Sequence, residues 1–270
     1  MAVLAPLKVD YPSLTTQEGA HPFTECALFA DHIKGMGYSW QANWHFIDIP
    51  YYSQGGDPSQ YSFKPDTVDL EGALTALVGM LTNTGDYKST TYYQQIAASF
   101  PNPADQLSFA LRLVIHYVGD IHQPLHAEAE VNSTYPSGDQ GGNKETVPST
   151  NGVSNLHSIW DSIIYQYTKD PTMPLSNTDW TWYTTTSAAW DAQYPAAANN
   201  IFPEDYMTWA NQSYNMAINY VYPGFTTGQT PSTTYDNSAI PQVEANIMLA
   251  GARLANLIET IYSPSSLFLQ

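Results

Sequence analysis

The feature that most constrains the fold is a long helical pattern that ends in "HYVGDIHQPLH", residues 116–126. Apolar residues recur at three- and four-residue steps through "PADQLSFALRLVIHYVGDIHQ", which predicts a helix over 104–122 that is ended by Pro124. Residues 116–126 carry three of the seven histidines of the chain and one aspartate. A lone histidine on such a helix is usually a core residue with one hydrogen bond. The cluster indicates metal binding only if the rest of the chain supplies further ligands.

Two histidine–aspartate pairs with the same spacing supply candidates. His116 and Asp120 are four residues apart, and so are His157 and Asp161 in "NLHSIWD". Residues four apart face the same side of a helix, so each pair would present two ligands to one ion. Imidazole nitrogen and carboxylate oxygen are ligands that zinc accepts. His126 follows the break at "QPL" and can turn back toward the helix end.

The acidic charge balance argues against binding of duplex nucleic acid and is compatible with bound divalent cations. Eight Lys+Arg stand against 25 Asp+Glu, for a formal net charge of −17. The chain therefore lacks the basic surface typical of proteins that bind duplex nucleic acid, and it would repel a polyanion at long range. Bound divalent cations could reverse that field locally. Cys26 is the one cysteine, so a metal site must use nitrogen and oxygen ligands.

Helical patterns dominate the remaining sequence. We expect further helices over 23–34, 67–85, 155–168, 203–222 and 239–262, an extended segment over 44–52, and loops over 131–153 and 222–238. The first residues do not form a signal peptide, and no apolar run is long enough to cross a membrane. The triplets at Asn132 and Asn211 fit the glycosylation pattern, which is weak support for secretion. We predict one mainly α-helical domain over residues 1–270.

The motifs resemble those of a known family. "FADHIK", "WHFIDIP", "HYVGDIHQPLH", "GDQGGN" and "NLHSIWD" occur in this order between about residues 27 and 165. They are similar to the motifs of the zinc-dependent single-strand-specific nucleases, which comprise fungal and plant extracellular nucleases and protozoan 3′-nucleotidase/nucleases. This family is related to zinc-dependent phospholipase C. The resemblance implies a helical fold with a multinuclear zinc cleft and long loops. It also implies cleavage of single-stranded DNA, RNA and 3′-nucleotides to 5′-phosphate products.

The resemblance also implies a role for individual residues. One zinc would be held by Asp31, His45, His116 and Asp120, and a second by His126, His157 and Asp161. Asp31 would orient the attacking water, and Lys34 would brace Asp31. Substrate would contact Phe46, Asp48 and Asn143, the first by stacking on a base. The family is secreted or enters a vacuolar or lysosome-like compartment, and it has no membrane segment and no obligate protein partner.

The family's third zinc is completed by an N-terminal Trp-Gly-x-x-Gly-His pattern, which does not occur in this chain. His21 is the one histidine upstream of Asp31, in a setting that does not match. We therefore expect two zinc sites, an incomplete third, and a family N-terminal segment that is missing here. Two alternative functions remain open. One is a phospholipase C relative, and the other is an inactive relic that binds metal or nucleotide.

Overall fold

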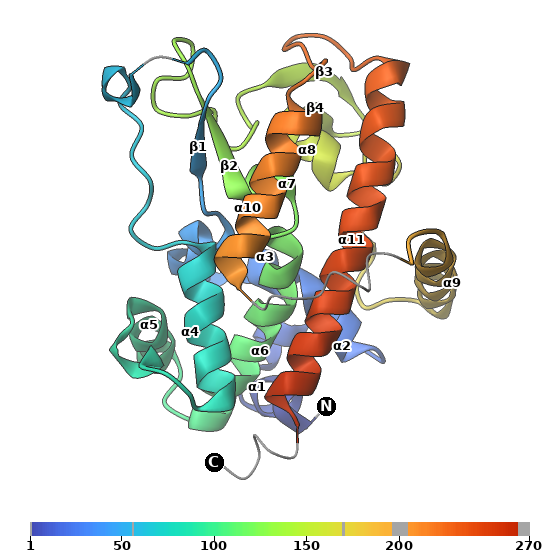
Figure 1. Ribbon diagram of the computed structural model, residues 1–270. Coiled ribbons are helices and arrows are strands. Elements are labelled where there is room, and N and C mark those ends of the chain that lie inside the picture. The colour runs from blue at the N-terminus through green and yellow to red at the C-terminus, as the bar shows by residue number, and fades with distance from the viewer. Residues whose placement is uncertain (1, 56, 169–170, 196–204, 264–270) are drawn as a thin grey trace.

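The computed structural model describes residues 2–55, 57–168, 171–195 and 205–263, and it is mainly helical (Figure 1), which confirms the predicted fold class. Helix α6 (Pro103–Asp120) lies at the centre. Helices that pack against it include α1 (Ala5–Asp10), α4 (Leu70–Thr82) and α11 (Thr233–Ile261). That the chain forms a single domain over 1–270 stays a prediction.

The other elements surround this centre. The remaining α-helices are α2 (Pro22–Glu25), α3 (Phe29–Ile33), α5 (Thr91–Ser99), α7 (Pro124–Ala127), α8 (Leu156–Asp161), α9 (Asn177–Gln193) and α10 (Tyr206–Met216). Short 3-10 helices cover Ala2–Leu4, Pro12–Thr15, Cys26–Leu28, Ser39–His45, Pro58–Gln60 and Tyr87–Ser89, and π-helical turns cover Lys34–Tyr38 and Ala217–Val221. Strand β1 (Ile49–Tyr52) pairs in parallel with β2 (Glu128–Val131), and β3 (Thr146–Thr150) pairs antiparallel with β4 (Val153–Asn155).

Helix α6 begins as the sequence predicts and ends earlier. The Asn102 side chain accepts a hydrogen bond from the backbone of Ala104 (3.0 Å), and Pro103 occupies the first helical turn, where its missing N–H costs nothing. Eleven of its eighteen residues are buried, so the helix is surrounded by protein. The helix ends at Asp120, not at residue 122, and Pro124 does not end it. Pro124 instead opens the next helix, α7.

The parallel pairing of β1 with β2 brings two distant motifs together. Ile49 lies opposite Glu128, and the backbone N–H of Ile47 donates to the carbonyl of His126 (2.9 Å). This pairing places the segment that follows His45 beside the segment that follows α6. The prediction of an extended segment over 44–52 holds for strand β1 only, because His45 closes a 3-10 helix and Asp48 has a positive φ angle (+49°). A proline often interrupts a strand, but β1 continues past Pro50 to Tyr52.

Several predicted boundaries are wrong for local reasons. The helix expected over 23–34 is broken into α2, a 3-10 turn and α3. The helix expected over 155–168 stops at Asp161, because three residues soon after it have positive φ angles: Ile163, Ile164 and Tyr165. The expected loop over 131–153 contains strand β3, and residues 233–238 of the second expected loop belong to α11. Residues 203–204 of the expected helix over 203–222 lie outside the described residues.

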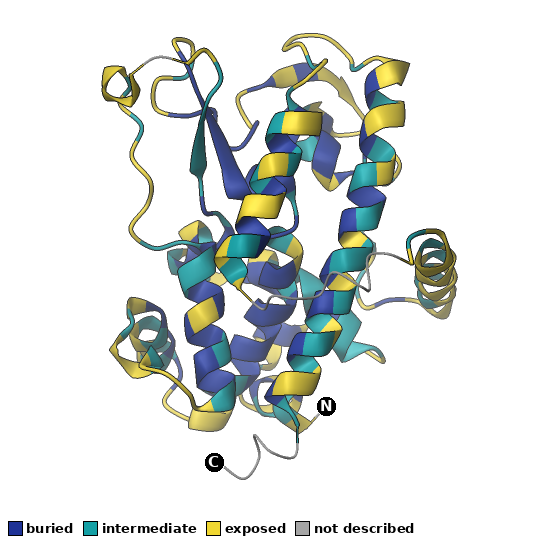
Figure 2. Cartoon of the chain, viewed as in Figure 1, coloured by how far each residue is buried: buried dark blue, intermediate teal, exposed yellow. Residues whose placement is uncertain are grey.

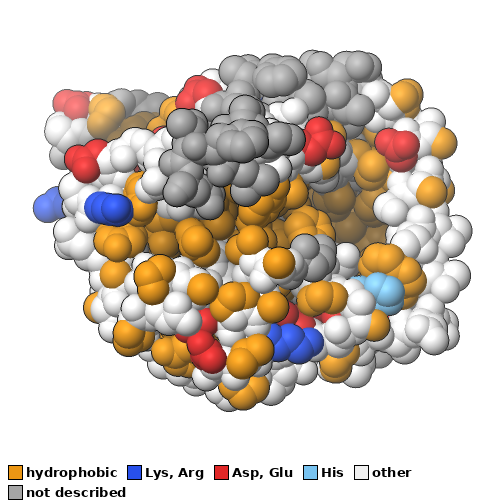
Figure 3. All heavy atoms as spheres, turned by 90° about the horizontal axis from the view of Figure 1, so that it is seen from below, with side chains coloured by type: hydrophobic (Ala, Val, Ile, Leu, Met, Phe, Trp, Pro, Cys, Tyr) orange, Lys and Arg blue, Asp and Glu red, His pale blue; other side chains and the backbone are white. Residues whose placement is uncertain are grey.

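Buried hydrophobic residues form two groups. The larger group surrounds α6, and the smaller group lies between α8, the β3–β4 pair and the start of α11. Figure 2 shows the inner faces of these helices as buried, whereas α9 at the edge is exposed or intermediate throughout. Seen from below, hydrophobic side chains gather across the surface, with few lysines or arginines among them (Figure 3). None of the described helices is long and apolar enough to cross a membrane.

Candidate metal centre

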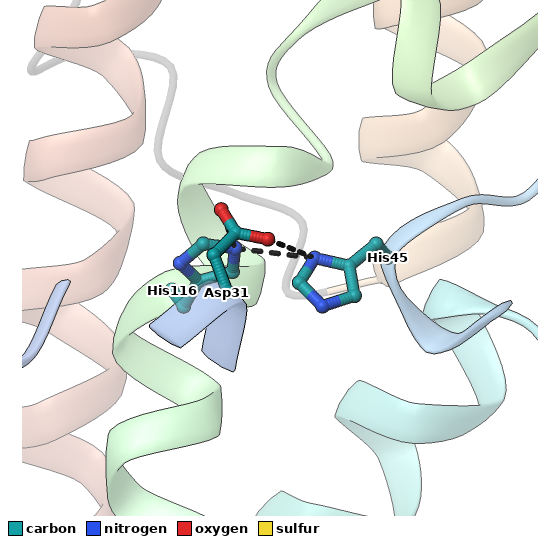
Figure 4. Close-up of side chains that lie close together, drawn as sticks. All are labelled: Asp31, His45 and His116. Atoms are coloured by element: carbon teal, nitrogen blue, oxygen red, sulfur yellow. Dashed lines mark hydrogen bonds and ion pairs between the residues drawn. The ribbon is translucent and has the colours of Figure 1, made fainter. Parts of the chain in front are cut away.

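Four of the predicted ligands converge at the end of α6. His116 and Asp120 come from its last turn, Asp31 from α3 and His45 from the 3-10 helix before β1; Figure 4 shows three of them. His45 Nδ1 lies 3.1 Å from His116 Nε2, and Asp120 Oδ2 lies 2.8 Å and 3.2 Å from these two nitrogens. Candidate ligand atoms of Asp31, His45 and His116 all lie within 4.8 Å of one another. We call these four residues the first ligand set.

Hydrogen bonds on the far side of each ring fix which nitrogen faces the cleft. The Gln41 amide donates to the carbonyl of Ala30 (2.7 Å), so its Oε1 accepts from His45 Nε2 (2.8 Å). His116 Nδ1 donates to the carbonyl of Ala27 (2.5 Å). His45 Nδ1 and His116 Nε2 therefore both face the cleft, 3.1 Å apart, where a shared proton or a metal ion can lie between or beside them. This arrangement of outer hydrogen bonds is typical of metal-bound histidines.

The electrostatics of the first ligand set favour positive charge. Burial lowers the pKa of His116, but the carboxylates of Asp120 and Asp31 outweigh it and raise that pKa to about 9. Burial would raise the pKa of Asp120, yet the neighbouring histidines 116 and 126 hold it well below its usual range. A cavity that stabilises a proton on imidazole in this way also attracts a metal ion. The set fits a divalent cation by donor type and by charge.

A second ligand set lies across Asp120 from the first. It consists of His126 from α7 with His157 and Asp161 from α8, and their candidate ligand atoms lie within 4.8 Å of one another. His126 Nδ1 donates to the carbonyl of His45 (2.8 Å), and His157 Nδ1 donates to that of Gly141 (2.7 Å), which leaves both Nε2 atoms as acceptors. Asp120 Oδ1 is 3.7 Å from His126 Nδ1, so one carboxylate stands between the two sets.

The glycines of "GDQGGN" explain how His157 is held. Gly141 and Gly142 both have positive φ angles, +56° and +75°. A Cβ at residue 141 would lie 2.2 Å from the carbonyl oxygen of Leu125, so no other residue fits there. The segment thus positions the carbonyl that accepts from His157. Sequence reasoning selected this loop for Asn143 and missed the role of its glycines.

The other predicted site residues lie beside these sets, with one exception. Lys34 Nζ donates to Asp31 Oδ1 at 2.7 Å. The Phe46 ring stacks on His126 with centroids 4.7 Å apart and planes at 24°. Burial raises the pKa of Asp48 to about 6, with a further contribution from Asp66.

The exception is Asn143, which is exposed and whose amide donates to the carbonyl of Gln140 (2.9 Å). Its side-chain oxygen accepts from the Asn155 amide at the start of α8 (3.4 Å), and neither hydrogen bond joins Asn143 to a ligand set. His21, the upstream histidine, stacks on Trp180 with ring centroids 3.7 Å apart and belongs to neither set. Among the described residues, the groups of three or more potential ligands are these two.

Sequence reasoning also missed Gln41 and the carbonyls of Ala27 and His45, which orient the histidines. The two carbonyls lie 89 and 81 positions from the histidines that donate to them, so local patterns carry no signal for them. Gln41 could have been noticed only as the residue four before His45 in a helical segment, where the two side chains share a face.

Comparison with known proteins agrees with this geometry. A family model described as S1/P1 Nuclease matches residues 7–263. Endonuclease 3 of Arabidopsis thaliana is 27% identical over 251 residues, which cover 86% of this chain and 74% of that protein. Nuclease P1 of Penicillium citrinum is 27% identical over 238 residues, covering 83% and 78%. Nuclease S1 of Aspergillus oryzae is 40% identical over 70 residues, covering 26% and 21%. The family and these names support hydrolysis of nucleic acid, and they confirm the resemblance: the chain belongs to the S1/P1 nuclease family.

Proposed function

We propose that the protein is a zinc-dependent nuclease and 3′-nucleotidase that hydrolyses phosphodiester and 3′-phosphate ester bonds in single-stranded DNA, RNA and nucleotides, with 5′-phosphate products. The observation that supports it most is the pair of facing nitrogens, His45 Nδ1 and His116 Nε2, 3.1 Å apart beside a carboxylate. The first ligand set would hold one zinc and the second another. Zinc lowers the pKa of bound water to about 7 and neutralises phosphoryl oxygens.

The chain's own residues would orient the reactants. Lys34 holds Oδ1 of Asp31, which leaves Oδ2 to accept a hydrogen bond from the attacking water. Both side chains are partly exposed, so the pair lies where substrate can reach it. Asp120 lies between the two sets and fixes their relative placement. We propose that Asn143, which is exposed in the loop "GDQGGN", contacts the substrate.

Phe46 and Asp48 support single-strand preference. Phe46 is only partly buried, so its ring would stack a base, and Asp48 would accept a hydrogen bond from that base. A base inside a duplex is stacked and paired already, so it reaches such a pocket only after extrusion, which costs energy.

We also propose that the protein acts in a secretory or vacuolar compartment, with nucleic acid as its partner and no obligate protein partner. Asn211 is exposed on α10 and is available for glycosylation. Asn132 is 7% exposed, and its side-chain oxygen accepts from the backbone of Thr134 and Tyr135. Of the two triplets, Asn211 is therefore the one that fits a glycan.

Metal removal tests the proposed function. After dialysis against EDTA, we expect no cleavage of single-stranded DNA, RNA or a 3′-mononucleotide, and recovery on adding zinc. His157→Asn should lose activity, while the matched change His32→Asn, outside both ligand sets, should retain it. Cleavage that persists without metal would exclude the mechanism. Zinc binding without cleavage would indicate the inactive relic, and hydrolysis of phosphatidylcholine in place of oligonucleotides would indicate the phospholipase C relative.

A further inference from the structure

The side chain of Gln123 contacts a ligand of the second ligand set. Its amide nitrogen Nε2 donates to Oδ1 of Asp161 at 2.8 Å. The other oxygen of this carboxylate, Oδ2, lies 3.5 Å from Nε2 of His157. Two ligand atoms of one tetrahedral zinc lie about 3.4 Å apart when each bond is roughly 2.1 Å long. Oδ2 is therefore the oxygen on the metal side of the carboxylate, and Oδ1 is the oxygen that Gln123 holds.

Asp161 depends on this contact because its own position leaves it free to turn. It is the last residue of α8, and 49% of its side chain is exposed. The terminal torsion of an aspartate side chain is broad, so such a carboxylate can present either one oxygen or both to an ion. Among the described residues, the side chain that donates a hydrogen bond to this carboxylate is Gln123.

The amide of Gln123 is itself held in one orientation. Its oxygen Oε1 accepts from the backbone N–H of Leu125 (2.6 Å) and so caps the start of α7. An amide has one oxygen acceptor and one nitrogen donor, so this cap turns Nε2 toward Asp161. Glutamine is not among the preferred capping residues, which are Ser, Thr, Asp and Asn. Serine would cap the helix well but is too short to extend to the carboxylate, so the longer side chain indicates a second role.

The backbone on which Gln123 stands is fixed by α11 and by the end of α6. The preceding residue, His122, is buried, and its Nε2 accepts from Arg253 of α11 (2.8 Å). The carbonyl of His122 accepts from the Asn246 amide of the same helix. The backbone N–H of Gln123 donates to the carbonyl of Asp120 (2.9 Å). A side chain on so constrained a backbone can place its amide accurately.

A cavity beside the second ligand set gives this placement a chemical use. The cavity has a volume of about 290 Å³, and Gln123 lines it together with Asp120, His126 and Asp161. Catalytic zinc sites combine three protein ligands with a fourth position that is open to water or substrate. His126, His157 and one oxygen of Asp161 make three ligands, whereas a second oxygen of Asp161 would fill the fourth position.

We propose that Gln123 is a positioning residue, which holds Oδ1 of Asp161 so that Oδ2 alone binds zinc and one position of that zinc stays open for water or a phosphoryl oxygen. The inference rests on the proposed function for the identity of the ion and deepens it by assigning the open position to the second ligand set. Without the Gln123 amide, Asp161 turns more freely, binds zinc more weakly and fills the open position for part of the time.

Two variants separate this role from helix capping alone. Gln123→Leu removes both hydrogen bonds of the side chain, whereas Gln123→Ser keeps a cap for Leu125 and removes only the bond to Asp161. By chelator competition, we expect each variant to bind one zinc as the native protein does and the other about 10- to 100-fold more weakly. Circular dichroism verifies folding. The matched control is Gln166→Leu, because the exposed Gln166 also donates to a carboxylate, that of Glu244 (3.3 Å), but touches neither ligand set. Native zinc affinity in either folded variant of residue 123 would overturn the proposal.

Cobalt substitution separates failure of this proposal from failure of the proposed function. The visible absorption of cobalt weakens as its coordination number rises, so the measurement needs no cleavage. Gln123→Ser should lose absorption relative to the native protein loaded with two cobalt ions. In saturating zinc, its kcat for a ten-nucleotide single strand should fall about 10- to 100-fold with KM nearly unchanged.

The outcomes of the cobalt experiment differ for the two proposals. A changed cobalt spectrum in Gln123→Ser, in a protein whose native form cleaves no nucleic acid, would support the positioning role and refute the proposed function. Identical cobalt spectra, with equal kcat in the native protein and the variant, would overturn the positioning role and leave the proposed function intact. Absence of metal from the second ligand set of the native protein would overturn both.

Discussion

Replacing Gln41 by leucine should weaken zinc binding at the first ligand set without touching a ligand. Gln41 is fully buried, and its side chain makes three hydrogen bonds: to His45 Nε2 (2.8 Å), to the Tyr117 hydroxyl (2.5 Å) and to the Ala30 carbonyl (2.7 Å). Leucine can make none of them. His45 would lose the acceptor that fixes its tautomer and its ring orientation. Loss of such an outer partner reduces metal affinity about 10- to 100-fold.

The same change has a calculable effect on stability. Three buried polar groups lose their partner, at about 1–3 kcal/mol each, so the free energy of unfolding should fall by about 3–9 kcal/mol. For a chain of this size, a lower limit of about 3 kcal/mol corresponds to a fall in Tm of about 6 °C. Because native stability is about 5–15 kcal/mol, folding of the variant must be verified by circular dichroism before zinc is titrated.

Chelator competition gives the zinc affinity, and Gln41→Glu provides the comparison. The carboxylate keeps an acceptor opposite His45 and Tyr117 but loses the donor to Ala30. We expect the glutamate variant to be destabilised and to bind zinc nearly as tightly as the native protein, while the leucine variant retains tight binding only at the second ligand set. If folded Gln41→Leu binds two zinc ions with native affinity, then Gln41 does not orient His45 and the reasoning is wrong.

Two further changes test the base site and the glycine loop. Phe46→Ala should raise KM for a 3′-mononucleotide by about 5- to 150-fold, because stacking of one base is worth about 1–3 kcal/mol. Steady-state kinetics on the zinc-loaded enzyme would measure it, and a change confined to kcat would contradict a stacking role. Gly141→Ala should weaken zinc binding at the second ligand set, because the added Cβ would collide with the carbonyl of Leu125. The control is Gly152→Ala, whose Cβ meets nothing within 4 Å. This change should lower the free energy of unfolding by only about 1–2 kcal/mol, because of the positive φ angle at residue 152. Equal zinc affinity and equal Tm in the two alanine variants would show that close approach at 141 does not matter.

The sequence predicted those parts of the fold whose signals are local. Helix α6 has a capping asparagine, a proline in its first turn and a clear apolar period, so its start was predicted within one residue. Its end was not, because Pro124 favours the start of a helix as readily as it ends one. Helix α9 was not predicted at all. It has no apolar stripe, since none of its residues is buried, and so the periodicity on which the prediction depends is missing.

In the candidate site, too, the sequence predicted the features that have local signals and missed those that depend on distant residues. The spacing of His116 with Asp120 and of His157 with Asp161 predicted that each pair shares a helix face, and the structure places each pair within 3.5 Å. Bringing Asp31 and His45 to His116 depended on the family resemblance, because no local pattern links residues some 70 positions apart. The orientation of His116, His126 and His157 depended on the carbonyls of Ala27, His45 and Gly141, whose positions only the folded chain determines.

The ligand sets also connect distant segments of the chain to one another. Each set joins segments that are far apart in the sequence: His45 and His116 are separated by 71 positions, and His126 and Asp161 lie on helices to either side of the glycine loop. With one cysteine, the chain cannot form an internal disulfide. A zinc ion bound at each set, as proposed, would close a long loop and act as a reversible cross-link, so metal binding would contribute to the folding free energy. Withdrawal of zinc should therefore release α3 and α8 from the end of α6 as well as stop the chemistry.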